Sequence, residues 1–199
     1  MPVKQLYIIR HGQTEFNSEQ RLQGQCNSPL TPLGEQQAQS VGLSLAAQAD
    51  IDTFALIASP LGRARQTAQW IAKALGQEAP SIRFDERLME FALGDWESLP
   101  APEIKALHPE FIDSKDWYLR APKAESLSAV KQRVNAFLND PKTPEKAIVV
   151  SHALTGSVLR ALLIGLDDTQ IFEQPRPQDS YFYVVNGQLT QIFCESEFI

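Results

Sequence analysis

Two histidines follow short apolar segments, and the first of them stands beside an arginine. Arg10-His11-Gly12 comes directly after the apolar run 6–9, and Ser151-His152 follows a second apolar run at 148–150. A neutral imidazole is a nucleophile, and a guanidinium presents a planar fork of donors that matches phosphate oxygens. The residue types at 10–12 therefore suit chemistry on a phosphate. Either histidine alone would more often be a hydrogen-bonded structural residue.

The segments before these histidines must bring them together. Residues 5–10, 54–58 and 147–150 form short, nearly continuous apolar runs, which are typical of strands buried on both faces of a parallel sheet. Ligands of open α/β sheets bind at the carboxyl ends of the strands. Because His11 and His152 each follow such a strand, we expect them to share one cleft.

A helix pattern follows each of the three predicted strands. The predicted helices start at Thr31-Pro32, at Ser59-Pro60 and near Thr155, and their apolar patterns end at Ala49, Leu75 and Leu163. A serine or threonine followed by proline suits a helix start, and Gly76 and Gly165 suit the ends of the two later helices.

The last part of the chain carries a different signal. Segments 181–185 and 189–193 flank Asn186-Gly187, a pair that is favoured in tight hairpins. We therefore predict an α/β fold, a three-layer α/β/α sandwich whose mostly parallel sheet ends in an antiparallel element.

Length and composition are those of one globular domain. With 199 residues, 43% of them hydrophobic and 21% charged, we expect a single domain over 1–199. No leader-like or bilayer-spanning run is visible, and Cys26 and Cys194 form no disulfide or zinc pattern, so we expect a cytoplasmic protein. The net charge of -6 argues against a nucleic-acid partner, although local arginines can still bind a small anion. The sequence leaves the oligomeric state open.

Four segments of this chain occur in an order that matches a known family. They are residues 10–38, residues 59–68 around Arg63, Glu90 followed by Gly94-Asp95-Trp96-Glu97, and Ser151-His152. In these segments the chain resembles the histidine phosphatase superfamily, also called phosphoglycerate mutase-like, from residue 5 to about residue 163. The first segment is highly specific for that family. The other segments would be weak evidence alone, and their order along the chain makes them strong evidence for the resemblance.

The resemblance implies a role for each matched residue. His11 would be the nucleophile that forms a phosphohistidine, and Glu90 would protonate the leaving oxygen and then activate water, with Glu97 as a nearby rival. The implied ligands of the phosphoryl oxygens are Arg10, Asn17, Arg63 and His152, and the possible further substrate contacts are Gln23 and Gly24. The resemblance implies no metal and no cofactor.

We therefore expect a metal-independent phosphomonoesterase that acts on a small phosphorylated substrate. The alternative is a bisphosphate-dependent phosphoglycerate mutase, but such mutases carry a long insertion between the acid and the second histidine, and the interval from Glu90 to His152 is short for one. A phosphate-binding module without catalysis is a third reading. The substrate itself is not encoded in the family motifs, because its contacts would come from a variable, lid-like segment at about 97–127.

Two positions depart from the family pattern. Ala153 and Ser98 stand where family members often have glycine. These changes affect the local backbone if either position requires a positive φ, which alanine and serine tolerate poorly. The sequence also leaves open whether Trp117 and Tyr118 line the lid or belong to the core.

Overall fold

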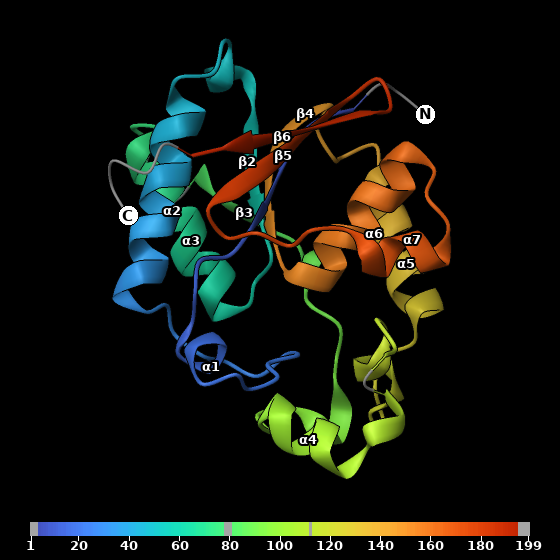
Figure 1. The fold of residues 1–199 in the computed structure, drawn as a ribbon. Helices are drawn as coiled ribbons and strands as arrows, with labels where there is room; N and C mark the ends of the chain where they lie inside the picture. The colour runs from blue at the N-terminus through green and yellow to red at the C-terminus, as the bar shows by residue number, and fades with distance from the viewer. Residues whose placement is uncertain (1–3, 78–80, 112, 195–199) are drawn as a thin grey trace.

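The computed structural model describes residues 4–77, 81–111 and 113–194, and a single six-stranded sheet organises them (Figure 1). The strands lie in the order β3-β2-β4-β1-β5-β6. They are β1 (Gln5–Arg10), β2 (Ala55–Ala58), β3 (Arg83–Phe84), β4 (Lys146–Ser151), β5 (Ser180–Val185) and β6 (Gln188–Phe193). The first four in the order pair in parallel, whereas β5 pairs antiparallel with both β1 and β6. The predicted mixed sheet is thus confirmed.

Helices cover both faces of this sheet. On one face lie α2 (Pro32–Ala46) and α3 (Gly62–Ala74), and on the other lie α5 (Leu127–Asn139), α6 (Ala153–Ile164) and α7 (Asp168–Glu173). Successive side chains of a strand point to opposite faces. Leu6 and Ile8 of β1 therefore join the core on the α5 and α6 side, whereas Tyr7 and Ile9 join the core on the α2 and α3 side. This is the predicted three-layer sandwich.

The shorter elements lie at the edges of the sandwich. They are α1 (Glu15–Ser18), α4 (Ala101–Leu107) and the 3-10 turns Ile51–Thr53, Glu86–Leu88, Gly94–Trp96, Pro109–Phe111 and Trp117–Arg120. In Figure 1, α4 lies at the lower end of the molecule, away from the sheet. Trp96, Ile104 and Trp117 form a small apolar core of their own there.

The register of the parallel strands sets the position of the two histidines. Arg10 of β1 pairs with Ser151 of β4, and Ala58 of β2 pairs with Val150 of β4. The next residue after each strand, which is His11, Ser59 or His152, therefore lies at the same edge of the sheet. This is the edge that the sequence predicted for a cleft.

Close backbone packing explains the glycine after His11. A Cβ atom on Gly12 would lie 2.2 Å from the main-chain oxygen of Gly34, which is in the first turn of α2. A Cβ on Gly34 would in turn lie 2.0 Å from the main-chain oxygen of Gln13. Both contacts are far too short for any side chain. The start of α2 thus packs directly on the backbone that follows β1.

Three predicted helix boundaries require correction. Helix α2 ends at Ala46, three residues before the predicted Ala49, and α6 begins at Ala153 rather than near Thr155. Helix α3 begins at Gly62 rather than at Ser59-Pro60, and the residue before it, Leu61, provides no side-chain cap. Oγ of Ser59 accepts from the amide of Leu61 at 3.3 Å and lies 2.8 Å from Nε2 of His152. The predicted end of α6 is confirmed, since Gly165 adopts the left-handed conformation. None of the helices in the described ranges is both long and apolar enough to cross a membrane.

Candidate active site

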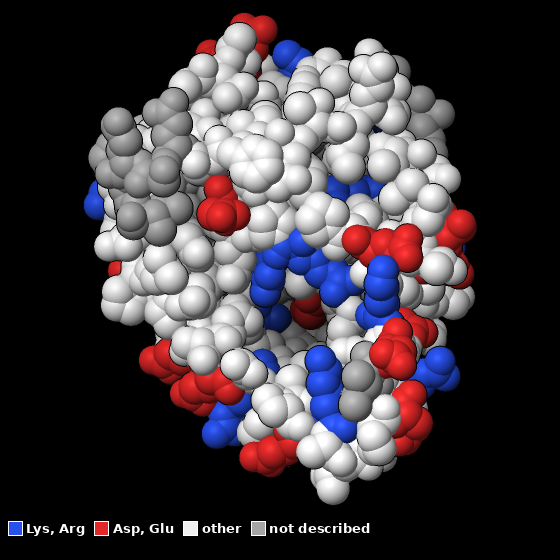
Figure 2. Space-filling model, viewed as in Figure 1, with Lys and Arg blue, Asp and Glu red and all other residues white. Residues whose placement is uncertain are grey.

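A cavity opens beyond the carboxyl ends of β1 and β4, and cationic side chains dominate its polar lining. Its volume is about 160 Å³. In Figure 2, Lys and Arg side chains surround a central hollow that has an acidic side chain inside it. The lining residues are Arg10, His11, Asn17, Arg21, Leu22, Gln23, Gly24, Arg63, Glu90, Leu93, Tyr118, Ala153, Leu154 and Arg176. They include every predicted site residue except His152.

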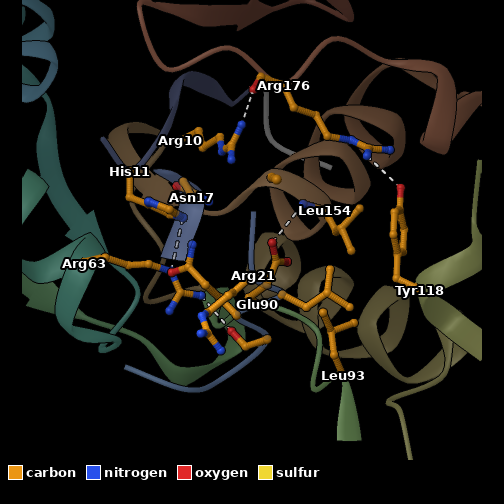
Figure 3. Close-up of a pocket in the computed structure, with 14 residues that line it drawn as sticks. Arg10, His11, Asn17, Arg21, Arg63, Glu90, Leu93, Tyr118, Leu154 and Arg176 are labelled. Atoms are coloured by element: carbon orange, nitrogen blue, oxygen red, sulfur yellow. Dashed lines mark hydrogen bonds between the residues drawn. The ribbon is translucent and has the colours of Figure 1, made fainter. Parts of the chain in front are cut away.

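The two ring nitrogens of His11 have different partners. Nδ1 lies 2.8 Å from the main-chain oxygen of Gly12, which can only accept a hydrogen bond, so Nδ1 carries the proton. Nε2 accepts a hydrogen bond of 3.1 Å from Nε of Arg63 (Figure 3). This network assigns a neutral ring whose lone pair is on Nε2.

Burial and like charge both favour the neutral ring. Burial lowers the pKa of His11 well below its ordinary value of 6.5, and the guanidinium groups of Arg63 and Arg10 lower it further. The hydrogen bond to Gly12 acts in the opposite direction but does not offset these effects. The pKa of His152 is also lowered well below 6.5, chiefly by burial and then by Arg63. Both rings are therefore uncharged at neutral pH.

Arg63 is held against His11 by main-chain oxygens. Only 1% of its surface is exposed. Its Nη1 donates to the oxygen of Cys26 at 2.9 Å, and its Nη2 donates to the oxygen of Gly24 at 2.7 Å. Gly24 has a φ of +52°, and a Cβ there would lie 2.2 Å from Oε1 of Glu97, so only glycine fits. The loop at 24–26 thus fixes the guanidinium.

Three arginines of the cavity lack a carboxylate partner. In the described ranges, no Asp or Glu oxygen lies within 4.0 Å of a guanidinium nitrogen of Arg10, Arg63 or Arg176. A main-chain oxygen takes that place for Arg10, whose Nη1 donates to the oxygen of Arg176 at 2.5 Å. Burial lowers the pKa of Arg10 and of Arg63 to about 10, so both stay cationic at neutral pH. Glu90 in the same cavity attracts both arginines without forming an ion pair, and the cationic surplus of the cavity suits an anionic ligand.

His152 lies behind the cavity wall. Its ring centroid is 5.2 Å from that of His11. Its Nε2 is 2.8 Å from Oγ of Ser59, and its Nδ1 is buried without a hydrogen-bond partner among the described residues. The structure thus places His152 beside His11, as the sequence predicted for the cleft, but not in the cavity lining.

Glu90 lies at the start of α6, where its carboxyl accepts four hydrogen bonds. Oε1 accepts from the amide of Phe91 at 3.1 Å and from both the amide and Oγ1 of Thr155 at 3.0 Å. Oε2 accepts from the amide of Leu154 at 3.1 Å. Free amides of a first helical turn are favourable partners for a carboxylate. With a single partner in the described structure, Oε2 retains capacity for a ligand in the cavity.

Glu97, the rival carboxyl, is used for structure. Its Oε1 accepts from the amides of Gln25 and Leu93 at 2.9 Å each, and its Oε2 accepts from Sγ of Cys26 at 3.2 Å. Glu97 therefore ties the loop at 24–26 to the turn at 93. It is not among the residues that line the cavity.

Asn17 and Gln23 present different polar groups to the cavity. Oδ1 of Asn17 accepts from the amide of Thr14 at 3.2 Å and from Nε2 of Gln178 at 3.1 Å, which leaves Nδ2 as the group that Asn17 can offer. Gln178 Nε2 also donates to the main-chain oxygen of His11 at 3.0 Å. Oε1 of Gln23 is buried and has no partner in the described part of the chain.

Several residues at the site had no sequence signal. Arg176 lies between two prolines in a segment that reads only as a loop, and Gln178 follows it. Ser59 has the residue type of a helix cap and was predicted as one, so no sequence signal indicated its contact with His152. The sequence left open whether Trp117 and Tyr118 line the lid or belong to the core. In the structure Tyr118 lines the cavity, whereas Trp117 belongs to the small core near α4.

The two departures from the family pattern have different consequences. Ser98 adopts a φ of +66°, so serine occupies a position that favours glycine. Its main-chain oxygen accepts a hydrogen bond from Nη1 of Arg21 at 2.9 Å. Ala153 is the first residue of α6 and has no positive φ, so alanine is accommodated there without strain.

The lowered pKa values of His11 and His152 predict that acid destabilises the protein. Below pH 6.5 the unfolded chain binds two protons that the folded protein excludes, so falling pH favours unfolding. Each histidine should remove about 1.4 kcal/mol of the free energy of unfolding per pH unit below that value. Urea unfolding between pH 7.5 and 5.5 measures this slope, and His11→Ala should lose about half of it. A flat profile would contradict the assignment of two neutral buried rings.

Comparison with known proteins agrees with this geometry. The family model described as "Histidine phosphatase superfamily (branch 1)" matches residues 6–185. Among sequence relatives, the protein named "Probable phosphoglycerate mutase GpmB" from several Escherichia coli strains is 36% identical over 174 residues. The aligned region covers 81% of this chain and 75% of that protein.

Solved structures extend the likeness to the whole fold. A mycobacterial glucosyl-3-phosphoglycerate phosphatase is 27% identical with a TM-score of 0.72, and the match covers 91% of this chain and 89% of that one. YhfR of Bacillus stearothermophilus is 30% identical with a TM-score of 0.75 and 96% coverage of both chains. From the extent of the family match, the chain belongs to the histidine phosphatase superfamily.

Proposed function

We propose that this protein is a phosphomonoesterase that acts through a phosphohistidine on His11. The observation that carries the proposal is the state of the His11 ring in the cavity. The ring is neutral, its proton is held on Nδ1 by Gly12, and its lone pair on Nε2 lies beside Arg63. Nε2 would attack phosphorus as the bond to the ester oxygen breaks, which divides one difficult displacement into two easier ones.

Guanidinium groups would bind the phosphoryl oxygens. Arg10 and Arg63 form no ion pair with a carboxylate in the described structure, and both line the cavity beside His11. When a phosphoryl group arrives, Nε of Arg63 can transfer its hydrogen bond from Nε2 of His11 to an oxygen of the group. This exchange frees the nucleophile. Asn17 Nδ2 would add a further donor, and the positive charge would stabilise the transition state without a metal ion.

Glu90 would move the protons. In the first step the protonated carboxyl gives its proton to the leaving ester oxygen, and in the second step the carboxylate takes a proton from the water that attacks the phosphohistidine. Oε2 suits this exchange because it has the single partner Leu154, whereas Oε1 has three hydrogen bonds.

The name of the Escherichia coli relative supports a second candidate, a phosphoglycerate mutase. A mutase would return the phosphoryl group from His11 to a second oxygen of the substrate and would need a bisphosphate primer. The hydrolase is favoured because the interval from Glu90 to His152 is short for the cleft-covering insertion of such mutases. A coupled assay separates the two by comparing the rates of interconversion and phosphate release. A binding module without catalysis would show neither.

Replacement of His11 tests the proposed nucleophile. We expect the wild-type protein to hydrolyse an aryl phosphate in the presence of a chelator, and His11→Ala to lower kcat at least about a thousandfold because the covalent step is lost. Release of the nitrophenol chromophore measures both rates. His108→Ala is the matched control, since that histidine is half-exposed and outside the cavity, and it should keep wild-type activity. Loss of wild-type activity on chelation would contradict the metal-independent reaction.

Replacement of Glu90 tests the proton donor. An alkyl ester needs protonation of its leaving oxygen, whereas nitrophenolate leaves readily without it. Glu90→Gln should therefore lower kcat/KM for an alkyl phosphate about a hundredfold or more, and much less for nitrophenyl phosphate. The ratio of the two values within one variant cancels any general structural damage. Equal losses for both esters would assign Glu90 to structure rather than to proton transfer.

A further inference from the structure

The connection between α7 and β5 contacts three of the residues that line the cavity. The main-chain oxygen of Arg176 accepts a hydrogen bond from Nη1 of Arg10 at 2.5 Å (Figure 3). Two residues later, Nε2 of Gln178 donates to the main-chain oxygen of His11 at 3.0 Å and to Oδ1 of Asn17 at 3.1 Å. Gln178 itself does not line the cavity. The connection therefore reaches the proposed nucleophile and two proposed phosphate ligands from outside.

The main-chain oxygen of His11 fixes the orientation of two side-chain amides. A carbonyl oxygen can only accept a hydrogen bond, so the end of the Gln178 amide that faces it is the NH2 group. The same NH2 group lies 3.1 Å from the Asn17 amide, so Asn17 turns its oxygen toward Gln178. The main-chain amide of Thr14, which can only donate, requires the same oxygen at 3.2 Å. Two independent neighbours thus assign one orientation to Asn17.

This orientation decides which group Asn17 offers to a ligand. Oδ1 accepts from Gln178 and from Thr14, which uses both of its lone pairs, so Nδ2 is the end of Asn17 that remains for the cavity. An NH2 group donates to a phosphoryl oxygen, whereas an amide oxygen in its place would repel that oxygen. Rotation of the Asn17 amide by half a turn would exchange the two groups and would break both hydrogen bonds.

The two hydrogen bonds to Oδ1 of Asn17 differ in what they connect. The bond from Thr14 is local, because it belongs to the capping box at the start of α1. The bond from Gln178 joins Asn17 to a nitrogen that also holds the main chain of His11. Through this shared partner, the distance between the phosphate ligand and the nucleophile is constrained. Small displacements of such groups have large effects on a reaction rate.

Side chains of α6 hold the connection in place. Arg160 is only 4% exposed and donates to Oε1 of Gln174 and to the main-chain oxygen of Pro175, at 2.8 Å each. Nε2 of Gln174 donates in turn to the main-chain oxygen of Ser157 at 2.9 Å. Gln178 therefore extends from a segment that is itself anchored, which is the condition for a side chain that orients others.

We propose that Gln178 is a positioning residue for the phosphate-binding group of Asn17, an inference that rests on the proposed reaction at His11. Gln178 contacts the main chain of His11 and not its reacting ring, so it acts through Asn17. Its NH2 group keeps Oδ1 of Asn17 occupied and leaves Nδ2 directed to the phosphoryl oxygens. A donor that is oriented in advance stabilises the charge of the transition state without having to turn during the reaction.

A double-mutant cycle tests the coupling between Gln178 and Asn17. Gln178→Met keeps a side chain of similar length and removes its donors. Calorimetry with inorganic phosphate should give a Kd about tenfold higher in Asn17→Ala, because a hydrogen bond to a charged group has about that value, and about fivefold higher in Gln178→Met. In the double variant the replacement at 178 should add less than about twofold, since no Asn17 amide remains to be oriented.

A matched control and the reaction rate complete the cycle. Gln188→Met replaces an exposed glutamine of β6 outside the cavity and should keep the wild-type Kd. An unchanged Kd in Gln178→Met, or an equal factor with and without Asn17, would overturn the proposal. Hydrolysis of nitrophenyl phosphate is measured separately. If the wild-type protein hydrolyses no ester but the coupling in phosphate binding is found, the proposed function fails and the positioning role stands. Hydrolysis without coupling has the opposite meaning.

Nuclear magnetic resonance of the wild-type protein tests the same geometry without a variant. Both side-chain amide hydrogens of Gln178 are in hydrogen bonds, so they should exchange with solvent more slowly than those of the exposed Gln188. Inorganic phosphate should shift the side-chain amide signals of Asn17. Equal exchange rates for the two glutamines, or Asn17 signals that do not respond to saturating phosphate, would reject the positioning role.

Discussion

The hydrogen bond from Arg63 to His11 sets the main constraint on this structure. In the proposed reaction the imidazole of His11 must stay neutral, and the phosphate that it would attack needs positive charge beside it. Burial and the nearby guanidinium groups meet both needs, since each lowers the pKa of His11. A carboxylate in an ion pair with these arginines would occupy the donors that an anionic ligand requires. Main-chain oxygens of Gly24, Cys26 and Arg176 hold the guanidinium groups instead, so the arginines are oriented but not neutralised.

The elements around the cavity position the main-chain oxygens that hold the arginines and the amides that hold Glu90. The parallel pairing of β1, β4 and β2 brings His11, His152 and Ser59 to one edge of the sheet. The loop at 24–26 reaches Arg63 because Glu97 binds it from the other side. The first turn of α6 provides the amides that hold Glu90. Each contact joins segments that are far apart in the sequence, so the site depends on the complete fold.

The sequence predicted the elements that repeat simple patterns. Apolar runs predicted β1, β2 and β4 but not the two-residue strand β3, and the Asn186-Gly187 pair predicted the hairpin of β5 and β6. Ordered motifs identified the family and the residues around the cavity. Contacts that depend on tertiary packing carried no such signal. Ser59 has the residue type of a helix cap yet contacts His152, and only the loop connection brings Arg176 to the cavity. Local patterns cannot report such contacts, because the partners lie far apart in the sequence, as Ser59 and His152 do at a separation of 93 positions.

The proposed phosphoryl transfer proceeds through His11 in two displacements. The most direct measurement is the stereochemical course at phosphorus, followed with an isotopically chiral thiophosphate ester hydrolysed in labelled water. Each in-line displacement inverts the phosphorus centre, so a phosphohistidine intermediate predicts overall retention of configuration. Overall inversion would show that water attacks the ester directly and would contradict the account.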